Sequence, residues 1–167
     1  MEKEITEVYC GNGRGKTTLA IGQALRASSQ GKSVIIIQFL KGNERRELDF
    51  LEELDQLDIK IFRFEKMESC YDQLNEEEQA EEERNILNGL NFARKVIATQ
   101  ECDFLVLDEI LGLLDKHIAT VDMVAGLLKQ KDESMHLILT GNRVDPGILD
   151  YVDSVTTITT LGREQNS

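Results

Sequence analysis

The 167-residue chain has no tryptophan, one proline and three cysteines, and these scarcities exclude several classes of protein. Cys10, Cys70 and Cys102 form no C-x-x-C pair, so we expect reduced thiols rather than a disulfide framework or a cysteine zinc site. No apolar run has the length of a membrane span, and the first residues, Met-Glu-Lys-Glu, do not resemble a signal peptide. We therefore expect a cytoplasmic protein without a membrane partner.

Basic residues are also scarce, with 19 Lys and Arg against 31 Asp and Glu, a formal net charge of -12 and a sequence pI of about 4.6. Because this charge repels phosphate backbones, we expect no nucleic-acid partner. Much of the excess lies in Glu76–Glu83, which we interpret as a solvated helix face. The length and a hydrophobic content of 41% fit a single domain over residues 1–167.

A glycine-rich stretch lies near the N-terminus, in Cys10–Thr18, which reads Cys-Gly-Asn-Gly-Arg-Gly-Lys-Thr-Thr. Three glycines at alternate positions allow a turn whose backbone N–H groups point inward, and Lys16 and Thr17 follow where a helix would begin. The phosphate-binding P-loop pattern is G-x-x-x-x-G-K-[ST], and this chain departs from it at Cys10, where the first glycine would stand. The stretch predicts phosphate binding, with a glycine-rich turn that binds nothing as the alternative.

Strand-like and helix-like segments alternate along the rest of the chain. We expect strands over residues 4–9, 33–39, 59–64, 104–107, 136–139 and 155–159. We expect helices over residues 17–30, 75–97 and 120–131, a helical turn over 48–54, a short helix over 146–151 and a frayed tail over 162–167. Several strands are continuous apolar runs, which is typical of strands covered on both faces. The pattern predicts a three-layer α/β fold with a mainly parallel central sheet.

Polar residues follow the predicted strands at their carboxyl ends, where parallel sheets bind ligands. Besides the glycine-rich loop, these are Gln38–Gly42, Asp108 with Glu109, and Thr140–Arg143. Asp108 and Glu109 come directly after four apolar residues, an arrangement that places a carboxylate beside the Mg²⁺ of a bound nucleotide. Two carboxylates at a strand end are also common as solvated turn residues, so the pair alone leaves both readings open.

Basic residues near the loop complete the predicted phosphate site. Lys16 would stabilise charge on a phosphate chain, and Arg14 adds a second cation within the loop. Arg26 lies farther along the predicted helix, where spacing alone indicates a surface arginine. His117 and His136 have no partners that the sequence reveals, and we leave them unassigned. Composition and motifs thus indicate a protein that binds Mg²⁺ and a nucleotide.

Four motifs together look like the ATP:corrinoid adenosyltransferase family. Gly11–Thr18 resembles the G-N-G-[KR]-G-K-T-T loop of that family, which also lacks the first P-loop glycine, and Gln38–Gly42 resembles its Q-F-[IL]-K-G segment. Leu107–Glu109 and Leu139–Gly141 follow in the same order. The resemblance implies a RecA-like P-loop NTPase fold that binds Mg-ATP with the triphosphate reversed relative to ordinary P-loop enzymes. A Co(I) corrinoid would attack the ribose 5′-carbon, and triphosphate would leave.

The resemblance also implies roles for individual residues. Asn12–Thr18 would hold the triphosphate, Thr17 and Glu109 would hold Mg²⁺, and Arg26 would help to bind the nucleotide. The candidate catalytic residues are Lys16, Asp108 and Glu109, and the candidate metal ligands are Thr17, Asp108 and Glu109. The candidate ATP- and corrinoid-binding residues are Gly11, Asn12, Gly13, Arg14, Gly15, Lys16, Thr17, Thr18, Arg26, Gln38, Lys41 and Tyr71. Because Co(I) is already a strong nucleophile, the protein needs alignment and charge stabilisation rather than a general base.

The chain departs from the family pattern in one loop and near its C-terminus. The Phe-x-Trp element that the family places after the third strand is absent, and Met67, Cys70 and Tyr71 stand in that loop. Thr140-Gly141-Asn142 stands where the family has T-G-R, with Arg143 one place later. Val155-Thr156-Thr157-Ile158 stands where the family has V-T-E-M. Two alternatives therefore stay open: a small P-loop ATPase or kinase that cleaves at a phosphate, and a non-catalytic module that binds a nucleotide or a corrinoid. The family further implies two partners, a flavoprotein that reduces the cobalt and a second copy of the chain in a homodimer.

Overall fold

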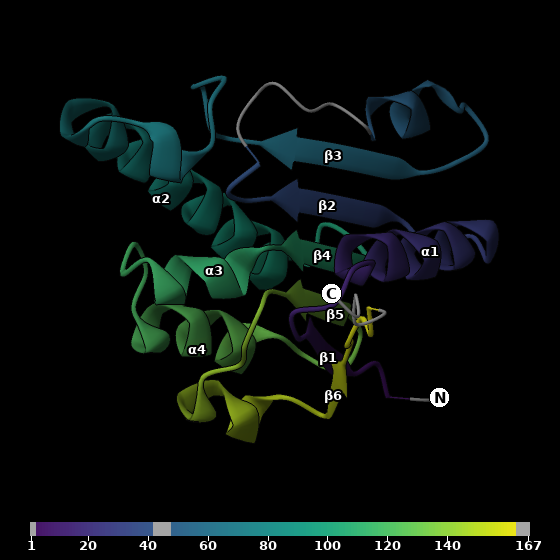
Figure 1. Cartoon of the computed structure of the whole chain (residues 1–167). Coiled ribbons are helices and arrows are strands. Elements are labelled where there is room, and N and C mark those ends of the chain that lie inside the picture. The colour runs from purple at the N-terminus through teal and green to yellow at the C-terminus, as the bar shows by residue number, and fades with distance from the viewer. Residues whose placement is uncertain (1–2, 42–47, 163–167) are drawn as a thin grey trace.

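A six-stranded sheet forms the centre of the described part of this computed structural model, which comprises residues 3–41 and 48–162 (Figure 1). The strands are β1 (Thr6–Cys10), β2 (Val34–Gln38), β3 (Ile59–Arg63), β4 (Phe104–Asp108), β5 (His136–Thr140) and β6 (Ser154–Thr157). Their order across the sheet is β3-β2-β4-β5-β1-β6, and every neighbouring pair is parallel. The six predicted strands are confirmed, and the sheet predicted to be mainly parallel is parallel throughout these residues.

Helices follow most of the strands. Within the described residues they are α1 (Lys16–Ser29), α2 (Glu76–Thr99), α3 (Ile110–Asp115) and α4 (Val121–Gln130), with 3₁₀ turns η1 (Asp49–Glu53), η2 (Tyr71–Gln73) and η3 (Pro146–Tyr151). Side-chain caps set two of the starts, because Asn75 Oδ1 accepts the N–H of Glu78 at 2.9 Å and Thr120 Oγ1 accepts the N–H of Met123 at 3.2 Å. Of the helices described, none has both the length and the apolar composition needed to cross a membrane.

Two details differ from the expected elements, and two expected segments are not tested by the structure. Helix α3 was not predicted, because six residues are too few to show a helical period. The expected helical turn over 48–54 and the expected short helix over 146–151 are 3₁₀ turns rather than α-helices. Gly42 of the predicted strand-end segment and residues 163–167 of the predicted frayed tail lie outside the described residues.

Helices cover both faces of the sheet, because successive strand residues point to opposite sides. The strand side chains that share one hydrophobic cluster with α1 are Tyr9, Val34, Ile36, Ile59, Phe104, Val106 and Ile138. Those that share the other cluster with α2, α3 and α4 are Val8, Cys10, Ile35, Ile37, Leu105, Leu107, Leu137 and Leu139. This confirms the three-layer α/β fold and explains the continuous apolar runs, since these strands are buried on both faces.

The acidic run at the start of α2 is not solvated along its whole length. Glu82 is only 1% exposed, and its carboxylate accepts the backbone N–H groups of Lys66 and Met67 at 2.9 and 3.1 Å. The side-chain amide of Asn85 donates to the same carboxylate at 2.8 Å. The interpretation of Glu76–Glu83 as a solvated face is therefore wrong for Glu82. Its carboxylate, rather than water, accepts hydrogen bonds from backbone N–H groups of the loop between β3 and α2.

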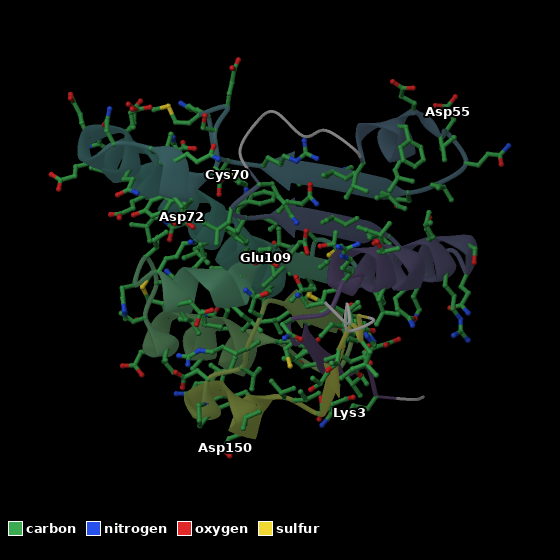
Figure 2. The ribbon with its side chains drawn as sticks, viewed as in Figure 1. Lys3, Asp55, Cys70, Asp72, Glu109 and Asp150 are labelled. Atoms are coloured by element: carbon green, nitrogen blue, oxygen red, sulfur yellow. The ribbon has the colours of Figure 1, made fainter. Side chains whose placement is uncertain are left out.

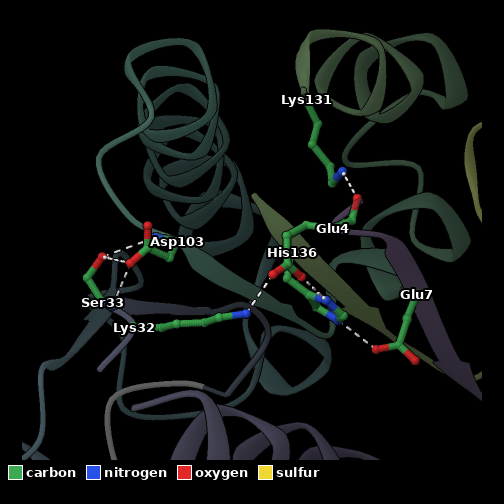
Figure 3. Close-up of polar contacts among 7 residues, drawn as sticks. All are labelled: Glu4, Glu7, Lys32, Ser33, Asp103, Lys131 and His136. Carbon is green, nitrogen blue, oxygen red and sulfur yellow. Dashed lines mark hydrogen bonds and ion pairs between the residues drawn. The ribbon is translucent and has the colours of Figure 1, made fainter. Parts of the chain in front are cut away.

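His136, left unassigned from the sequence, lies between two carboxylates at the amino end of β5 (Figure 3). Its Nδ1 is 3.1 Å from Glu4 Oε2, and its Nε2 is 2.7 Å from Glu7 Oε2. Lys32 Nζ donates to Glu4 Oε1 at 2.6 Å, and the Phe104 ring stacks on the imidazole with centroids 4.6 Å apart. These contacts tie the N-terminal segment to β5 at the edge of the sheet opposite to the carboxyl ends of the strands.

Candidate functional site

A row of polar side chains lies at the carboxyl ends of four adjacent strands. Arg63, Gln38 and Asp108 are register partners on β3, β2 and β4, and each is the last residue of its strand. Thr140 ends the next strand, β5. Gln38, Asp108 and Thr140 are buried, and their positions continue the alternation of strand residues that pack against α1. We call these four residues the strand-end row.

Asp108 is the centre of the strand-end row, and it is fully buried. Its Oδ1 accepts hydrogen bonds from the hydroxyls of Thr17 at 2.9 Å and Thr140 at 2.7 Å. Its Oδ2 accepts one from Gln38 Nε2 at 3.1 Å and lies 3.8 Å from Lys41 Nζ. A buried carboxylate is tolerated only with such donors around it. The structure therefore brings together four residues that the sequence analysis named: Asp108, Thr17, Gln38 and Lys41.

Glu109 differs from its neighbour in environment, although the two carboxylates are adjacent in sequence. Its backbone N–H donates to Thr140 Oγ1 at 2.8 Å, and its φ of 63° turns the chain from β4 into α3. Burial raises the pKa of the Glu109 carboxyl above its ordinary value, and the positive charge of Lys41 opposes this shift. Asp108 is thus held by several donors, whereas Glu109 presents a half-buried carboxylate at the start of α3.

The glycine-rich loop leads directly into α1 at the carboxyl edge of the sheet. Gly15 has a φ of 100°, a conformation that glycine adopts without strain. Lys16 Nζ donates to the carbonyls of Gly11 and Gly13 at 2.7 and 3.2 Å and to Asn142 Oδ1 at 3.2 Å. The first N–H groups of a helix have no intrahelical acceptor and carry partial positive charge, so the start of α1 is suited to an anion.

Part of the loop backbone bonds to the chain itself rather than pointing inward. Gly11 N–H donates to Asn142 O at 2.8 Å, Gly13 N–H to Ile158 O at 2.9 Å and Arg14 N–H to Thr160 Oγ1 at 2.8 Å. The expectation of inward-pointing N–H groups is therefore wrong at Gly11, Gly13 and Arg14. A Cβ built on Gly13 would lie 2.6 Å from Ile158 O, so the segment after β6 is what requires glycine there. That segment forms one wall of the loop.

Two hollows flank the start of α1 and share Thr18 in their lining. The first has a volume of about 700 Å³ and runs along the outer side of α1, where it brings Arg14 and Arg26 together. The second has a volume of about 220 Å³ and lies between Thr17 and the strand-end row, with Lys41 in its wall. Arg26 is therefore an exposed arginine, as its spacing indicated, that shares a hollow with the phosphate loop.

Tyr71 belongs to a different part of the molecule, the loop between β3 and α2. Its hydroxyl donates to Glu83 Oε1 at 2.5 Å, and burial together with that carboxylate raises the pKa of Tyr71 to about 12. Lys116 Nζ contacts both carboxylate oxygens of Asp72 at 2.6 Å, which ties this loop to the end of α3. Figure 2 labels Asp72 on this loop and Glu109 at the end of β4. A role of Tyr71 toward a corrinoid stays a prediction.

Arg63 was not predicted as a site residue, and Thr140 and Asn142 had no predicted role. Thr140 and Asn142 belong to the T-G-N segment, and their contacts with Asp108 and Lys16 arise because β5 lies between β4 and β1. Arg63 looked like an ordinary polar residue of an alternating strand. The only feature of the sequence that pointed to Arg63 was its position near the end of a predicted strand. To place Arg63 beside Gln38, the order of the strands must also be known.

The chain is similar to corrinoid adenosyltransferases over almost its whole length. Residues 2–165 match the family described as "ATP:corrinoid adenosyltransferase BtuR/CobO/CobP". The corrinoid adenosyltransferase of Escherichia coli K12 is 29% identical over 160 residues, which covers 93% of this chain and 76% of that protein. Corrinoid adenosyltransferase CobA of Salmonella typhimurium LT2 is 28% identical over 158 residues, with the same coverage of 93% and 76%.

A solved structure shares the architecture. The KaiC-like protein PH0186 of Pyrococcus horikoshii OT3 superposes with a TM-score of 0.62 over 94% of this chain and 72% of that chain, at 19% sequence identity. At this identity the similarity concerns the fold alone. Together with the parallel sheet and the loop at the start of α1, it supports the expected RecA-like P-loop fold.

Proposed function

Because the chain belongs to the ATP:corrinoid adenosyltransferase family, we propose that it transfers the 5′-deoxyadenosyl group of ATP to the Co(I) of a corrinoid and releases triphosphate. The structural observation that carries this proposal is the 2.9 Å hydrogen bond from Thr17 to Asp108. This hydrogen bond joins the start of α1, which follows the phosphate loop, to the end of β4, which supplies the carboxylates. A site for a metal-bound nucleotide requires the phosphate loop and a carboxylate to lie close together. Residues 1–167 act as one nucleotide-binding domain in this proposal.

The triphosphate is proposed to lie at the start of α1. The N–H groups of Gly15–Thr18 face it, Lys16 turns its ammonium from the loop carbonyls to the phosphate oxygens, and the Arg14 side chain adds a second charge. This assignment is narrower than Asn12–Thr18, because two N–H groups of the loop are bonded to the segment after β6. Triphosphate is the leaving group, so these donors stabilise the charge that develops on it.

Mg²⁺ is part of the proposal, because the donor set at this edge of the sheet fits it. Thr17, Asp108 and Glu109 offer a hydroxyl and two carboxylates, the oxygen ligands that Mg²⁺ prefers. No group of three or more His, Cys, Asp or Glu residues in the described ranges could hold a metal ion without a nucleotide. Phosphate oxygens and water are therefore expected to complete the coordination, as is common for Mg²⁺. The ion would neutralise charge on the triphosphate.

The adenosyl group is proposed to point toward the strand-end row. In the reversed orientation that the family resemblance implies, the adenosine side of ATP lies toward the 220 Å³ hollow lined by Thr17, Gln38 and Lys41. The terminal phosphate then points toward the hollow beside Arg26. In this arrangement the chain aligns the 5′-carbon for attack and excludes water, since the cobalt is itself the nucleophile. The loop that carries Tyr71 is the proposed contact for the corrinoid.

The reaction requires cobalt in the Co(I) state, so an external reductant belongs to the proposal. A flavoprotein is the expected electron donor, and spectroscopic reduction of the corrinoid in a reconstituted mixture would test it. Homodimerisation and a cytoplasmic location also stay predictions. Light scattering of the purified chain at several concentrations would test the first, and fractionation of cells would test the second.

The experiment that tests the proposed function is anaerobic incubation with Mg-ATP and chemically reduced cob(I)alamin. The corrinoid spectrum and the released polyphosphate are followed together. Adenosylcobalamin with intact triphosphate supports the proposal, whereas release of inorganic phosphate without adenosylation supports the ATPase or kinase alternative. Binding of Mg-ATP without turnover of either kind supports the non-catalytic module.

Two lysine variants make that experiment specific to the loop. Lys16→Ala is expected to lower kcat/KM by roughly a hundredfold, because it removes the charge nearest the phosphates. Lys95→Ala is the matched control, since Lys95 is 68% exposed on α2. Equal activity of Lys16→Ala and Lys95→Ala would contradict the phosphate-loop assignment.

A further inference from the structure

Arg63 is connected to Asp108 through the side chain of Gln38. Arg63 Nε–H donates to Gln38 Oε1 at 2.8 Å, and Gln38 Nε2 donates to Asp108 Oδ2 at 3.1 Å. The three residues face one another in register on adjacent parallel strands. A continuous line of hydrogen bonds therefore runs from the edge strand β3 to the buried carboxylate at the centre of the sheet.

The polarity of this line permits one orientation of the Gln38 amide. An amide side chain has an oxygen that accepts and a nitrogen that donates, whereas the Arg63 guanidinium only donates and the Asp108 carboxylate only accepts. A flipped amide would place donor against donor at Arg63 and oxygen against oxygen at Asp108. Gln38 is 5% exposed, so water has little access to relieve either contact. Arg63 thus helps to determine which group Gln38 presents to Asp108.

The Gln38 amide and the Thr17 hydroxyl bind the two different oxygens of the Asp108 carboxylate. With Oδ2 of Asp108 held by Gln38, Oδ1 faces the hydroxyls of Thr17 and Thr140. Linked hydrogen bonds polarise one another in a buried site, so the guanidinium charge acts on the carboxylate through the amide. Both Gln38 and Arg63 also line the 220 Å³ hollow next to Thr17.

We propose that Arg63 is a positioning residue of the nucleotide site, acting through Gln38 on Asp108 and so on the hydroxyl of Thr17. The proposal rests on the proposed function, because it assigns Asp108 and Thr17 to the nucleotide. Arg63 orients the groups that meet the nucleotide and its metal ion.

A double-mutant cycle tests the route of this effect. Arg63→Met, Gln38→Met and the double variant are compared with the parent for kcat and KM in the adenosylation assay. Arg63→Met is expected to lower kcat/KM roughly tenfold in the parent, the size expected for one charge-assisted hydrogen bond. In the Gln38→Met background the same change should have less than about a twofold effect, because the connecting amide is gone.

A spectroscopic arm reports the contact without any turnover. The side-chain NH₂ resonance of Gln38, assigned by its absence in Gln38→Met, is followed in ¹⁵N-labelled protein without ligand. Arg63→Met should shift this resonance, and Arg63→Lys, which keeps a donor, should shift it less and recover part of the activity. Lys60→Met is the matched control, because Lys60 is exposed on the same strand and its loss changes the net charge equally.

The outcomes separate this proposal from the proposed function. Equal losses from Arg63→Met in both backgrounds, or an unmoved Gln38 resonance, would overturn the positioning role while leaving adenosylation intact. An Arg63→Lys variant as inactive as Arg63→Met, with both folded by thermal melting, would also overturn it. A parent protein that neither binds nor turns over Mg-ATP would instead overturn the proposed function, and the positioning role with it, even where the resonance shifts.

Discussion

Replacing Thr140 by valine tests the strand-end row at its most constrained hydroxyl. The Thr140 hydroxyl donates to Asp108 Oδ1 at 2.7 Å and accepts the backbone N–H of Glu109 at 2.8 Å, and the residue is fully buried. Valine keeps the branched shape and exchanges the hydroxyl for a methyl group. Both hydrogen bonds are therefore lost with little change in volume, and the N–H of Glu109 loses its acceptor.

The expected magnitude follows from the two contacts. A hydrogen bond to a charged group contributes about 1.5–3 kcal/mol, and a buried N–H without an acceptor costs about 1–3 kcal/mol. Asp108 keeps the donors from Thr17 and Gln38, and burial of the new methyl group offsets about 1 kcal/mol. We expect Thr140→Val to lower the free energy of unfolding by about 2–4 kcal/mol. For a chain of this length that is a fall in Tm of roughly 5–12 °C.

Urea unfolding followed by circular dichroism, with thermal melts in parallel, measures this effect. Thr140→Ser keeps the hydroxyl and loses a methyl group, so it should be the milder change. Thr156→Val on the exposed edge strand β6 is the matched control and should stay within about 0.5 kcal/mol of the parent. A Thr140→Val protein as stable as the parent, or more stable than Thr140→Ser, would refute the reasoning about the hydroxyl.

Three further predictions concern other parts of the chain. Gly13→Ala should lower Tm by roughly 3–9 °C, since its Cβ meets a backbone carbonyl at 2.6 Å and overpacking costs about 1–3 kcal/mol. Ellman's reagent should react promptly with one thiol of the native protein, that of exposed Cys70. Cys10 and Cys102 are buried, and burial raises the pKa of Cys102 to about 12. Glu4→Gln should reduce Tm at pH 7, because the hydrogen bond from Lys32 holds the pKa of Glu4 below its ordinary value of 4.5. That stabilisation is present above pH 4.5 and is lost as the pH falls through the lower folded pKa, so the two proteins should converge in acid.

Each of these predictions has its own control. Gly126→Ala, in α4 with no atom outside the local helix backbone within 4 Å of the added Cβ, should raise stability by up to about 1 kcal/mol. Equal losses at Gly13 and Gly126 would contradict the steric argument. Three thiols should react in guanidinium chloride, and a native Cys70→Ser protein that still reacts promptly would contradict the burial of the other two. A Tm difference for Glu4→Gln that stays constant from pH 7 to pH 3 would show that charge is not its cause.

Local features of the sequence determined the fold class and the position of the phosphate loop. Hydrophobic periodicity and the apolar runs depend on residues close together in the chain, so the six strands and the longer helices were predictable. The short helix α3 was not, because its apolar run covers less than two turns. The pattern of glycines, Lys16 and Thr17 carries its own chemistry, and the placement of Asp108 followed from the strand before it. The motifs carried the family resemblance, which the comparisons then confirmed.

Contacts between strand ends were decided only by the tertiary structure. Arg63, Gln38 and Asp108 are far apart in sequence and meet because the order β3-β2-β4 places their strands side by side in register. The burial of Glu82 also depends on tertiary structure, because its carboxylate accepts hydrogen bonds from backbone N–H groups of the loop that precedes α2. The loop N–H groups bonded to the segment after β6 depend on a pairing between the two ends of the chain. Periodicity reports which face of an element is buried, whereas the partner of each polar group depends on strand order and register, which no local pattern encodes.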